Sequence, residues 1–86
     1  MTDIVIYTSP ICPYCVRAKQ LLQRKGQSWK EVDVSVSAEV RDEMMKKSGG
    51  KRSVPQIFIN GTHIGGSDDL YALEAAGKLD PLLKAS

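Results

Sequence analysis

The stretch IVIYTSPICPYCVRAKQLL, residues 4 to 22, contains a β-branched and aromatic run, both cysteines of the chain, and the start of an apolar pattern with helical spacing. The run IVIYT is typical of a short strand covered on both faces, because polar and apolar residues do not alternate in it. Pro13 fits the first turn of a helix, where its missing N–H has no helical partner to lose. The residues that then recur on one helical face are Cys15, Ala18, Leu21 and Leu22. The stretch therefore predicts a central strand, a loop that carries Cys12, and a helix over residues 13 to 25.

The middle of the chain is predicted to form a second strand and a second helix. Residues 29 to 34, WKEVDV, have strand character. Ser37 is a typical helix N-cap, Glu39 places an acid in the first turn, and Gly49 and Gly50 end the pattern. Because a helix separates the first two strands, we expect them to be parallel and joined by a right-handed crossover.

The last third of the chain is predicted to form a hairpin and a third helix. Asn60-Gly61, between QIFIN and THIG, is a strong signal for a two-residue hairpin turn. We expect Ser67 to cap the following helix, Gly77 to end it, and Asp80-Pro81 to begin one last turn. The order β-α-β-α-β-β-α predicts an α/β protein with a four-stranded mixed sheet and flanking helices.

Length and composition predict one small globular domain, residues 1–86, in which 42% of the residues are hydrophobic and 26% are charged. The apolar run near the N-terminus is too short for a signal peptide or a membrane span, so we expect a soluble cytoplasmic protein. We also expect the protein to be a monomer. The densest basic stretch, KKSGGKR at 46 to 52, is short and lacks the aromatic residues that stack on bases. Nucleic acids and membranes are therefore not expected as partners.

The two cysteines, Cys12 and Cys15, allow three interpretations. A structural disulfide across so short a loop would contribute only about 2 kcal/mol before strain is subtracted. A closed zinc site needs four ligands, and beyond the two thiols only His63 is a candidate, so no metal is expected within one chain. The third interpretation is redox chemistry, because a CxxC pair near a β-α-β pattern is typical of thioredoxin-like proteins.

The position of each cysteine predicts its role in redox chemistry. Cys12 lies at the N-terminal end of the predicted helix, where unpaired backbone N–H groups and the helix dipole favour a thiolate, so it is the expected nucleophile. Cys15 lies within the first turn, where it is more covered, and it is the expected resolving thiol. Pro13 stiffens the turn, whereas Tyr14 either forms an aromatic wall beside the attacking sulfur or only packs there.

Three segments of the chain resemble a known family, and the resemblance runs over nearly the whole chain. YTSPICPYC, SVPQIFINGTHIGGSDDL and GKLDPLL look like the corresponding segments of dithiol glutaredoxins. The CPYC sequence differs from thioredoxins, which carry Gly and Pro between the cysteines, and from the monothiol class with CGFS. The resemblance implies a thioredoxin fold, a redox-active disulfide between Cys12 and Cys15, and glutathione-dependent reduction of protein disulfides and glutathione mixed disulfides. Glutathione would then be a co-substrate, and no cofactor would be permanently bound.

The resemblance also implies which residues bind glutathione: Tyr14, Arg52, Val54, Pro55, Gly66, Ser67 and Asp68. The Val54–Pro55 bond is cis in the family, and Val54 would offer its backbone N–H and C=O to the cysteine of glutathione, as an added strand does.

The charged ends of glutathione would be held by other segments. The helix start at Gly66–Asp68 would bind the γ-glutamyl carboxylate on free N–H groups, with the Asp68 side chain pairing the amine. Arg52, together with Lys51, is the candidate for the glycyl carboxylate. The chain departs from the family at Ser9, where many members carry Lys, and at Ser53, where they carry Thr.

A rival function of another class is a glutathione-ligated dimer that binds an iron–sulfur cluster through two Cys12 thiolates, as some glutaredoxins do. Pro13 speaks against it, because cluster-binding relatives usually carry Gly or Ser at that position. A reductase fed by a flavoprotein is a further alternative, which the GGSDD segment does not favour. The expected partners are glutathione and disulfide-bonded or glutathionylated proteins, and ribonucleotide reductase is a known partner of such proteins.

Overall fold

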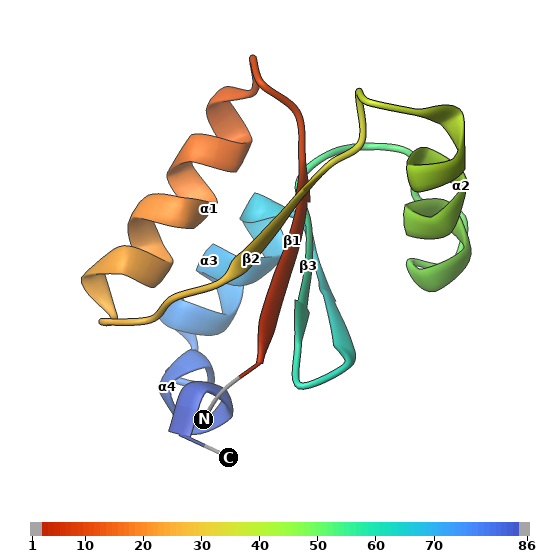
Figure 1. The fold of residues 1–86 in the computed structure, drawn as a ribbon. Helices are drawn as coiled ribbons and strands as arrows, with labels where there is room; N and C mark the ends of the chain where they lie inside the picture. The colour runs from red at the N-terminus through yellow and green to blue at the C-terminus, as the bar shows by residue number, and fades with distance from the viewer. Residues whose placement is uncertain (1–2, 85–86) are drawn as a thin grey trace.

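The computed structural model describes residues 3–84, which form a sheet between helices on both of its faces (Figure 1). The elements, in chain order, are β1 (Ile4–Thr8), α1 (Pro13–Arg24), β2 (Lys30–Asp33), α2 (Ala38–Lys47), β3 (Gln56–Ile59), β4 (Thr62–Gly65), α3 (Ser67–Ala75) and α4 (Leu79–Lys84). The predicted order β-α-β-α-β-β-α is confirmed. The last turn expected at Asp80-Pro81 is part of the short helix α4, which begins one residue earlier.

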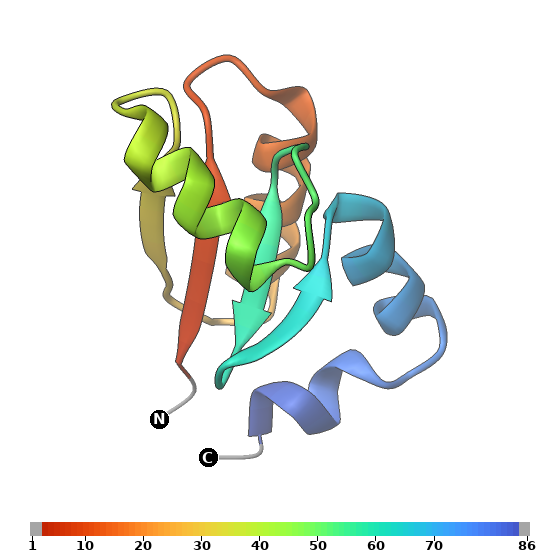
Figure 2. The ribbon, with the colours of Figure 1, turned by 90° about the vertical axis from the view of Figure 1, so that its right-hand side faces the viewer.

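The sheet has the strand order β2-β1-β3-β4, so β1 and β3 are its central strands. β1 pairs in parallel with β2 and antiparallel with β3, and β3 pairs antiparallel with β4. Figures 1 and 2 show α1 and α3 on one face of the sheet and α2 on the other. The four-stranded mixed sheet with flanking helices is therefore confirmed.

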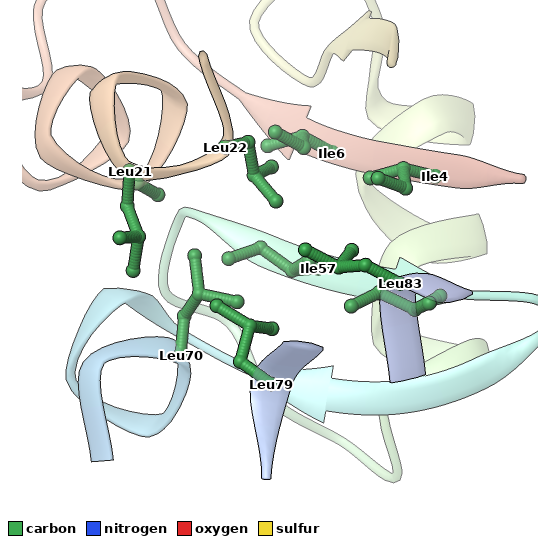
Figure 3. Close-up of a cluster of buried hydrophobic side chains, with 10 residues drawn as sticks. Ile4, Ile6, Leu21, Leu22, Ile57, Leu70, Leu79 and Leu83 are labelled. Atoms are coloured by element: carbon green, nitrogen blue, oxygen red, sulfur yellow. The ribbon is translucent and has the colours of Figure 1, made fainter. Parts of the chain in front are cut away.

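The two faces of the sheet bury cores of different character. The core under α1, α3 and α4 is aliphatic (Figure 3) and consists of Ile4, Ile6, Ala18, Leu21, Leu22, Ile57, Ile59, Leu70, Leu79 and Leu83. The core under α2 consists of Tyr7, Val34, Met44 and Phe58, and the Tyr7 hydroxyl donates to Glu43 of α2 over 2.7 Å. Burying one large aliphatic side chain contributes about 1.5–3 kcal/mol. The aliphatic core therefore fixes α1 firmly against the end of β1.

The connection from β1 to α1 is the part of the fold that positions the cysteines. Cys12 has extended backbone angles and is the N-cap of α1, and Pro13 is the first helical residue. Proline suits this position because its φ is already helical and it has no N–H to leave unpaired. Gly26, with φ of +71°, follows the end of the helix as predicted.

The start of α3 differs from the sequence prediction. Ser67 was expected as the N-cap, but it is the first helical residue, and Gly66 is the N-cap with extended backbone angles. The backbone N–H of Gly66 donates to Asp69 Oδ2 over 3.0 Å, so a carboxylate in the first turn binds back to the N-cap backbone, as in one half of a capping box. The prediction was wrong because it used the cap preference of serine alone.

The hairpin of β3 and β4 confirms the signal at Asn60-Gly61. These two residues have φ of +52° and +82°, as a two-residue hairpin turn of this type requires. Further along the hairpin, Phe58 pairs with His63 but Ile57 pairs with Gly65, so β4 contains one extra residue, a β-bulge. A bulge re-aims the side chains next to it.

Candidate active site

Both cysteines are unbonded thiols at the start of α1. Cys12 is 9% exposed and Cys15 is 1% exposed. The backbone N–H of Cys15 donates to Cys12 Sγ over 3.2 Å. The sulfur of Cys12 thus takes the place of the oxygen that usually caps a helix, where negative charge is stabilised.

The surroundings of Cys15 favour its protonated form. Burial raises the pKa of the Cys15 thiol above its ordinary value, and the hydrogen bond with Cys12 raises it further. The Thr8 side chain and the Ser9 backbone act in the opposite direction with smaller effect. Because Cys12 is the more exposed sulfur and caps the helix, it is the better placed of the two to attack a disulfide.

The segment that precedes β3 lies beside Cys12. The Val54–Pro55 bond is cis, as the family resemblance implied. The Cys12 thiol donates to the carbonyl oxygen of Val54, with 3.7 Å between sulfur and oxygen. The backbone of Val54 is therefore next to the more exposed sulfur, although 42 residues separate the two in sequence.

A groove of about 470 Å³ runs from this segment to the start of α3. Its lining residues are Tyr14, Lys51, Ser53, Val54, Pro55, Gln56, His63, Ile64, Gly65, Gly66, Ser67, Asp68 and Asp69. Tyr14 follows Cys12 by two residues and is 56% exposed, so an aromatic side chain borders the groove close to the thiols.

The far end of the groove is the N-terminus of α3. The first N–H groups of a helix have no partner within the helix, and they attract anions together with the helix dipole. Gly65 lets the Asp69 carboxylate approach the backbone closely, because a Cβ atom at this residue would overlap that carboxylate, and its φ of +119° also favours glycine. Asp68 and Asp69 give the first turn two carboxylates. This end of the groove therefore offers backbone donors and side-chain acceptors within one helical turn, which suits a ligand that carries both a carboxylate and an amine.

The structure brings together most of the residues that the resemblance implied for glutathione. The ones that line the groove are Tyr14, Val54, Pro55, Gly66, Ser67 and Asp68. Arg52 is exposed and is not among the lining residues, whereas its neighbour Lys51 is. Of these two cations, Lys51 is therefore the one that lines the groove.

Sequence reasoning missed Gln56 as part of the groove. Gln56 is 2% exposed and opens a strand, QIFI, in which every residue is buried. A polar residue directly after the Val54-Pro55 pair, in an otherwise apolar strand, was the signal that could have identified it. His63, which was considered above only as a possible zinc ligand, lines the same groove.

The described part of the chain contains neither a metal-binding group of side chains nor a membrane-spanning helix. Within residues 3–84, no three side chains of His, Cys, Asp and Glu gather closely enough to hold a metal ion. Over the same range, no helix has the length and hydropathy that crossing a bilayer requires.

Comparison with known proteins places the chain in a family. The family model described as Glutaredoxin matches residues 4–64, which include both cysteines and the Val54–Pro55 bond. Among the curated relatives, Glutaredoxin 3 of Escherichia coli (strain K12) is 57% identical over 84 residues, which cover 98% of this chain and 100% of the relative.

Solved structures of similar proteins have the same fold. A glutaredoxin from Brucella melitensis is 58% identical with a TM-score of 0.85, over 98% of this chain and 90% of that one. A structure described as "Metal Binding of Glutaredoxins" is 60% identical with a TM-score of 0.74, over the same shares of the two chains. A buckwheat glutaredoxin–glutathione complex is 29% identical with a TM-score of 0.86, over 95% of this chain and 76% of that one.

Proposed function

The chain belongs to the glutaredoxin family, so it is a thiol–disulfide oxidoreductase with a thioredoxin fold, and we propose that glutathione is the co-substrate that drives it. The proposed substrates are glutathionylated proteins and proteins with disulfide bonds. Such an activity would serve thiol redox homeostasis in the cell.

One observation carries the proposal: the groove runs to the N-terminus of α3 from Val54, whose carbonyl oxygen lies 3.7 Å from the Cys12 sulfur. Glutathione has a thiol in its middle and carboxylates at both ends, so a ligand of this shape can reach the sulfur and the helix start together. The buckwheat protein, which forms a glutathione complex, has the same fold over 95% of this chain and so supports the proposal.

The binding roles follow from the chemistry of each end. The backbone of Val54 would pair with the cysteine residue of glutathione, and the amides at Gly66–Asp68 would receive the γ-glutamyl carboxylate. The Asp68 carboxylate would accept from the amine. Arg52 is the cation implied by the resemblance for the glycyl carboxylate, and we propose that Lys51 shares this role because it lines the groove.

A glutathionylated protein would be reduced through Cys12 alone. The Cys12 thiolate attacks the glutathione sulfur, a Cys12–glutathione disulfide forms, and the protein thiolate leaves. The thiolate of a second glutathione then attacks the glutathione sulfur of this adduct. Glutathione disulfide leaves, and the Cys12 thiolate is restored.

A protein disulfide would require both cysteines. Cys12 attacks one sulfur of the substrate, and the other substrate sulfur leaves as a thiolate. Cys15 then loses its proton and attacks Cys12, which releases the second substrate thiolate and leaves a Cys12–Cys15 disulfide. One glutathione opens this disulfide by attack on Cys12, and a second releases glutathione disulfide, as in the first route.

The test is NADPH-coupled turnover of a glutathionylated peptide by the wild-type protein. One assay contains glutathione and glutathione reductase, and the other contains thioredoxin reductase without glutathione. We expect turnover only in the first assay. Turnover only in the second would contradict the proposed co-substrate.

A second candidate function is binding of an iron–sulfur cluster by a dimer, and the 60% identical structure described as "Metal Binding of Glutaredoxins" favours keeping it. Because no metal-binding group of side chains gathers within residues 3–84, further ligands would have to come from a second chain and from glutathione. Protein purified without oxygen and reconstituted with iron, sulfide and glutathione would show charge-transfer absorption in the visible range if this function is real. A colourless protein would exclude it.

We also propose the setting in which the protein works. It would act as a monomer of one domain in the cytoplasm, where the glutathione pool is reducing enough to drive the cycle. Ribonucleotide reductase is the proposed example of a protein substrate.

A further inference from the structure

Gln56 and His63 line the groove, but the mechanism above gives neither of them a role. The side-chain amide nitrogen of Gln56 donates to the carbonyl oxygen of Ser53 over 3.0 Å and to Ser53 Oγ at 3.3 Å. The amide oxygen of the same side chain lies 2.7 Å from His63 Nε2. Gln56 thus connects β4 to the segment that precedes β3.

The hydrogen bonds of Gln56 determine which nitrogen of His63 carries a proton. A carbonyl oxygen can only accept, so the atom of Gln56 that faces the Ser53 carbonyl must be the NH₂ group. The opposite atom is then the amide oxygen, and it also can only accept. His63 Nε2 must therefore be a donor, which fixes the Nε2–H tautomer of the neutral ring.

The backbone of β4 and the ring of Phe58 hold His63 in this orientation. His63 lies next to the β-bulge that shifts the register of β4 against β3. The centres of the Phe58 and His63 rings are 5.0 Å apart, and the ring planes are tilted by 36°. The ring is thus supported on one side by an aromatic residue while Nε2 points to Gln56.

We propose that His63 is a positioning residue for the active site. Its Nε2–H orients the Gln56 amide, the amide holds Ser53, and Ser53 fixes the backbone of Val54 against Cys12. This inference rests on the proposed function, because it matters only if the Val54 backbone pairs with glutathione.

The consequence of losing the donor follows from burial. Gln56 is 2% exposed, so loss of the His63 donor would leave its amide oxygen buried and without this hydrogen bond. A buried acceptor without a partner is unfavourable, and the side chain gains by rotating toward water. Rotation would break both bonds to Ser53, and the Val54 backbone would lose part of its support.

The test compares two replacements of His63. His63→Phe keeps an aromatic ring against Phe58 but removes the donor, whereas His63→Gln places an amide NH₂ group near the position of Nε2. We expect His63→Phe to raise KM for a glutathionylated peptide about five- to tenfold with kcat within about twofold of the wild type, since one buried hydrogen bond to the loop is lost. His63→Gln should restore KM to within about twofold of the wild type.

Two controls separate this effect from a general loss of stability. Trp29→Phe also removes one aromatic N–H donor, which here binds Glu31 outside the groove, and it should leave KM unchanged. Gln56→Met should raise KM as much as His63→Phe does, and the double variant should be no worse than either single variant. Additive effects of the two changes would overturn the proposal.

A second readout needs no variant and no turnover. Long-range ¹H–¹⁵N correlation spectra of the wild type, recorded where His63 is neutral, should show the Nε2–H tautomer. The Nδ1–H tautomer would overturn the proposal even if the enzyme is active. If the wild type is active and His63→Phe has the same KM and kcat as the wild type, the proposal is overturned as well. If the wild type shows no glutathione-dependent turnover, the proposed function is refuted instead.

Discussion

The starts of α1 and α3 use the same backbone feature in two different ways. At α1, the cap is the Cys12 sulfur, the first helical residue is Pro13, and the first turn contains no acidic residue. At α3, the cap is Gly66, and the first turn contains Asp68 and Asp69. Tyr14 of the first helix turn lines the groove that reaches the second helix start.

In our interpretation, the helix start at α1 holds the reacting sulfur, whereas the helix start at α3 binds the ligand. At α1, the Cys12 sulfur itself accepts from a backbone N–H of the first turn, so the reacting atom is part of the helix start. At α3, the Asp69 carboxylate already accepts from the Gly66 N–H, and Asp68 is the proposed acceptor for an amine. In our account, changes at the first start remove turnover, whereas changes at the second weaken binding.

The largest effect is expected at α1. Cys12→Ser should abolish turnover of glutathionylated peptide to the background rate, because a hydroxyl is not a usable nucleophile in disulfide exchange. The NADPH-coupled assay measures this directly. Residual turnover carried by Cys15 would contradict the assignment of Cys12 as the nucleophile.

Cys15→Ser distinguishes the roles of the two cysteines in α1 and its N-cap. It should abolish reduction of a protein disulfide but leave deglutathionylation within about threefold of the wild type, because only the first reaction needs a resolving thiol. Insulin reduction and peptide deglutathionylation, measured on the same preparation, separate the two routes. Equal loss in both assays would mean that Cys15 acts in every turnover.

Gly65→Ala is the strongest single change expected at the α3 start. The added Cβ would overlap the Asp69 carboxylate at a residue with φ of +119°, and we expect a loss of about 1–3 kcal/mol in stability and a higher KM for glutathione. Urea unfolding and steady-state kinetics measure the two effects.

Gly61→Ala is the matched control for Gly65→Ala. Gly61 also has a positive φ, of +82°. Apart from its chain neighbours, no heavy atom of the described residues lies within 4 Å of a Cβ placed there. The substitution should reduce stability by about 1–2 kcal/mol and leave KM unchanged. A rise in KM in both variants would show that KM follows stability and not the shape of the groove.

Asp68→Asn tests recognition of the amine. The loss of one exposed ion pair is worth about 1 kcal/mol or less, so KM for glutathione should rise by at most about fivefold, with kcat unchanged. Asp42→Asn, an exposed carboxylate on α2, is the control and should have no effect. A lower kcat in Asp68→Asn would contradict a role limited to binding.

The smallest effect is a dependence of stability on pH. Burial raises the pKa of Cys15 above its ordinary value of 9.0, so the unfolded chain loses this proton first as the pH rises. The contribution of Cys15 to stability is therefore constant below about pH 9 and falls between the unfolded and the folded pKa. Urea unfolding of the reduced protein should show a steeper loss of stability above pH 9 in the wild type than in Cys15→Ser. Parallel curves would contradict the raised pKa.

The parts of the fold that depend on neighbouring residues were predictable from the sequence. The start of α1 followed from Pro13 and the apolar spacing after it, and the hairpin followed from Asn60-Gly61. The parallel pairing of β1 with β2 and the antiparallel pairing of β3 with β4 followed from the rules for crossovers and hairpins, whereas the position of β3 beside β1 was not predicted. The cis bond before Pro55 came only from the family resemblance, because most bonds before proline are trans.

The parts that depend on contacts between distant segments were not predictable. Ser67 has the better cap preference, but the structure uses Gly66, because the Asp69 carboxylate reaches back to its N–H. Gln56 joins Ser53 to His63, a residue next to the bulge in β4, and these contacts link segments that are not neighbours in sequence. Lys51 lines the groove and Arg52 does not, and the sequence alone does not distinguish these two neighbouring cations.

The most direct test of whether glutathione on Cys12 reaches the α3 start is a ¹⁵N NMR comparison. Spectra of Cys15→Ser are recorded before and after Cys12 has formed a mixed disulfide with glutathione. We expect large amide shifts at Val54 and at Ser67 and Asp68, since one ligand molecule would span the groove from Cys12 to the α3 start. Shifts confined to the neighbours of Cys12 would show that the attached glutathione does not reach the α3 start, and would contradict the division between chemistry and recognition.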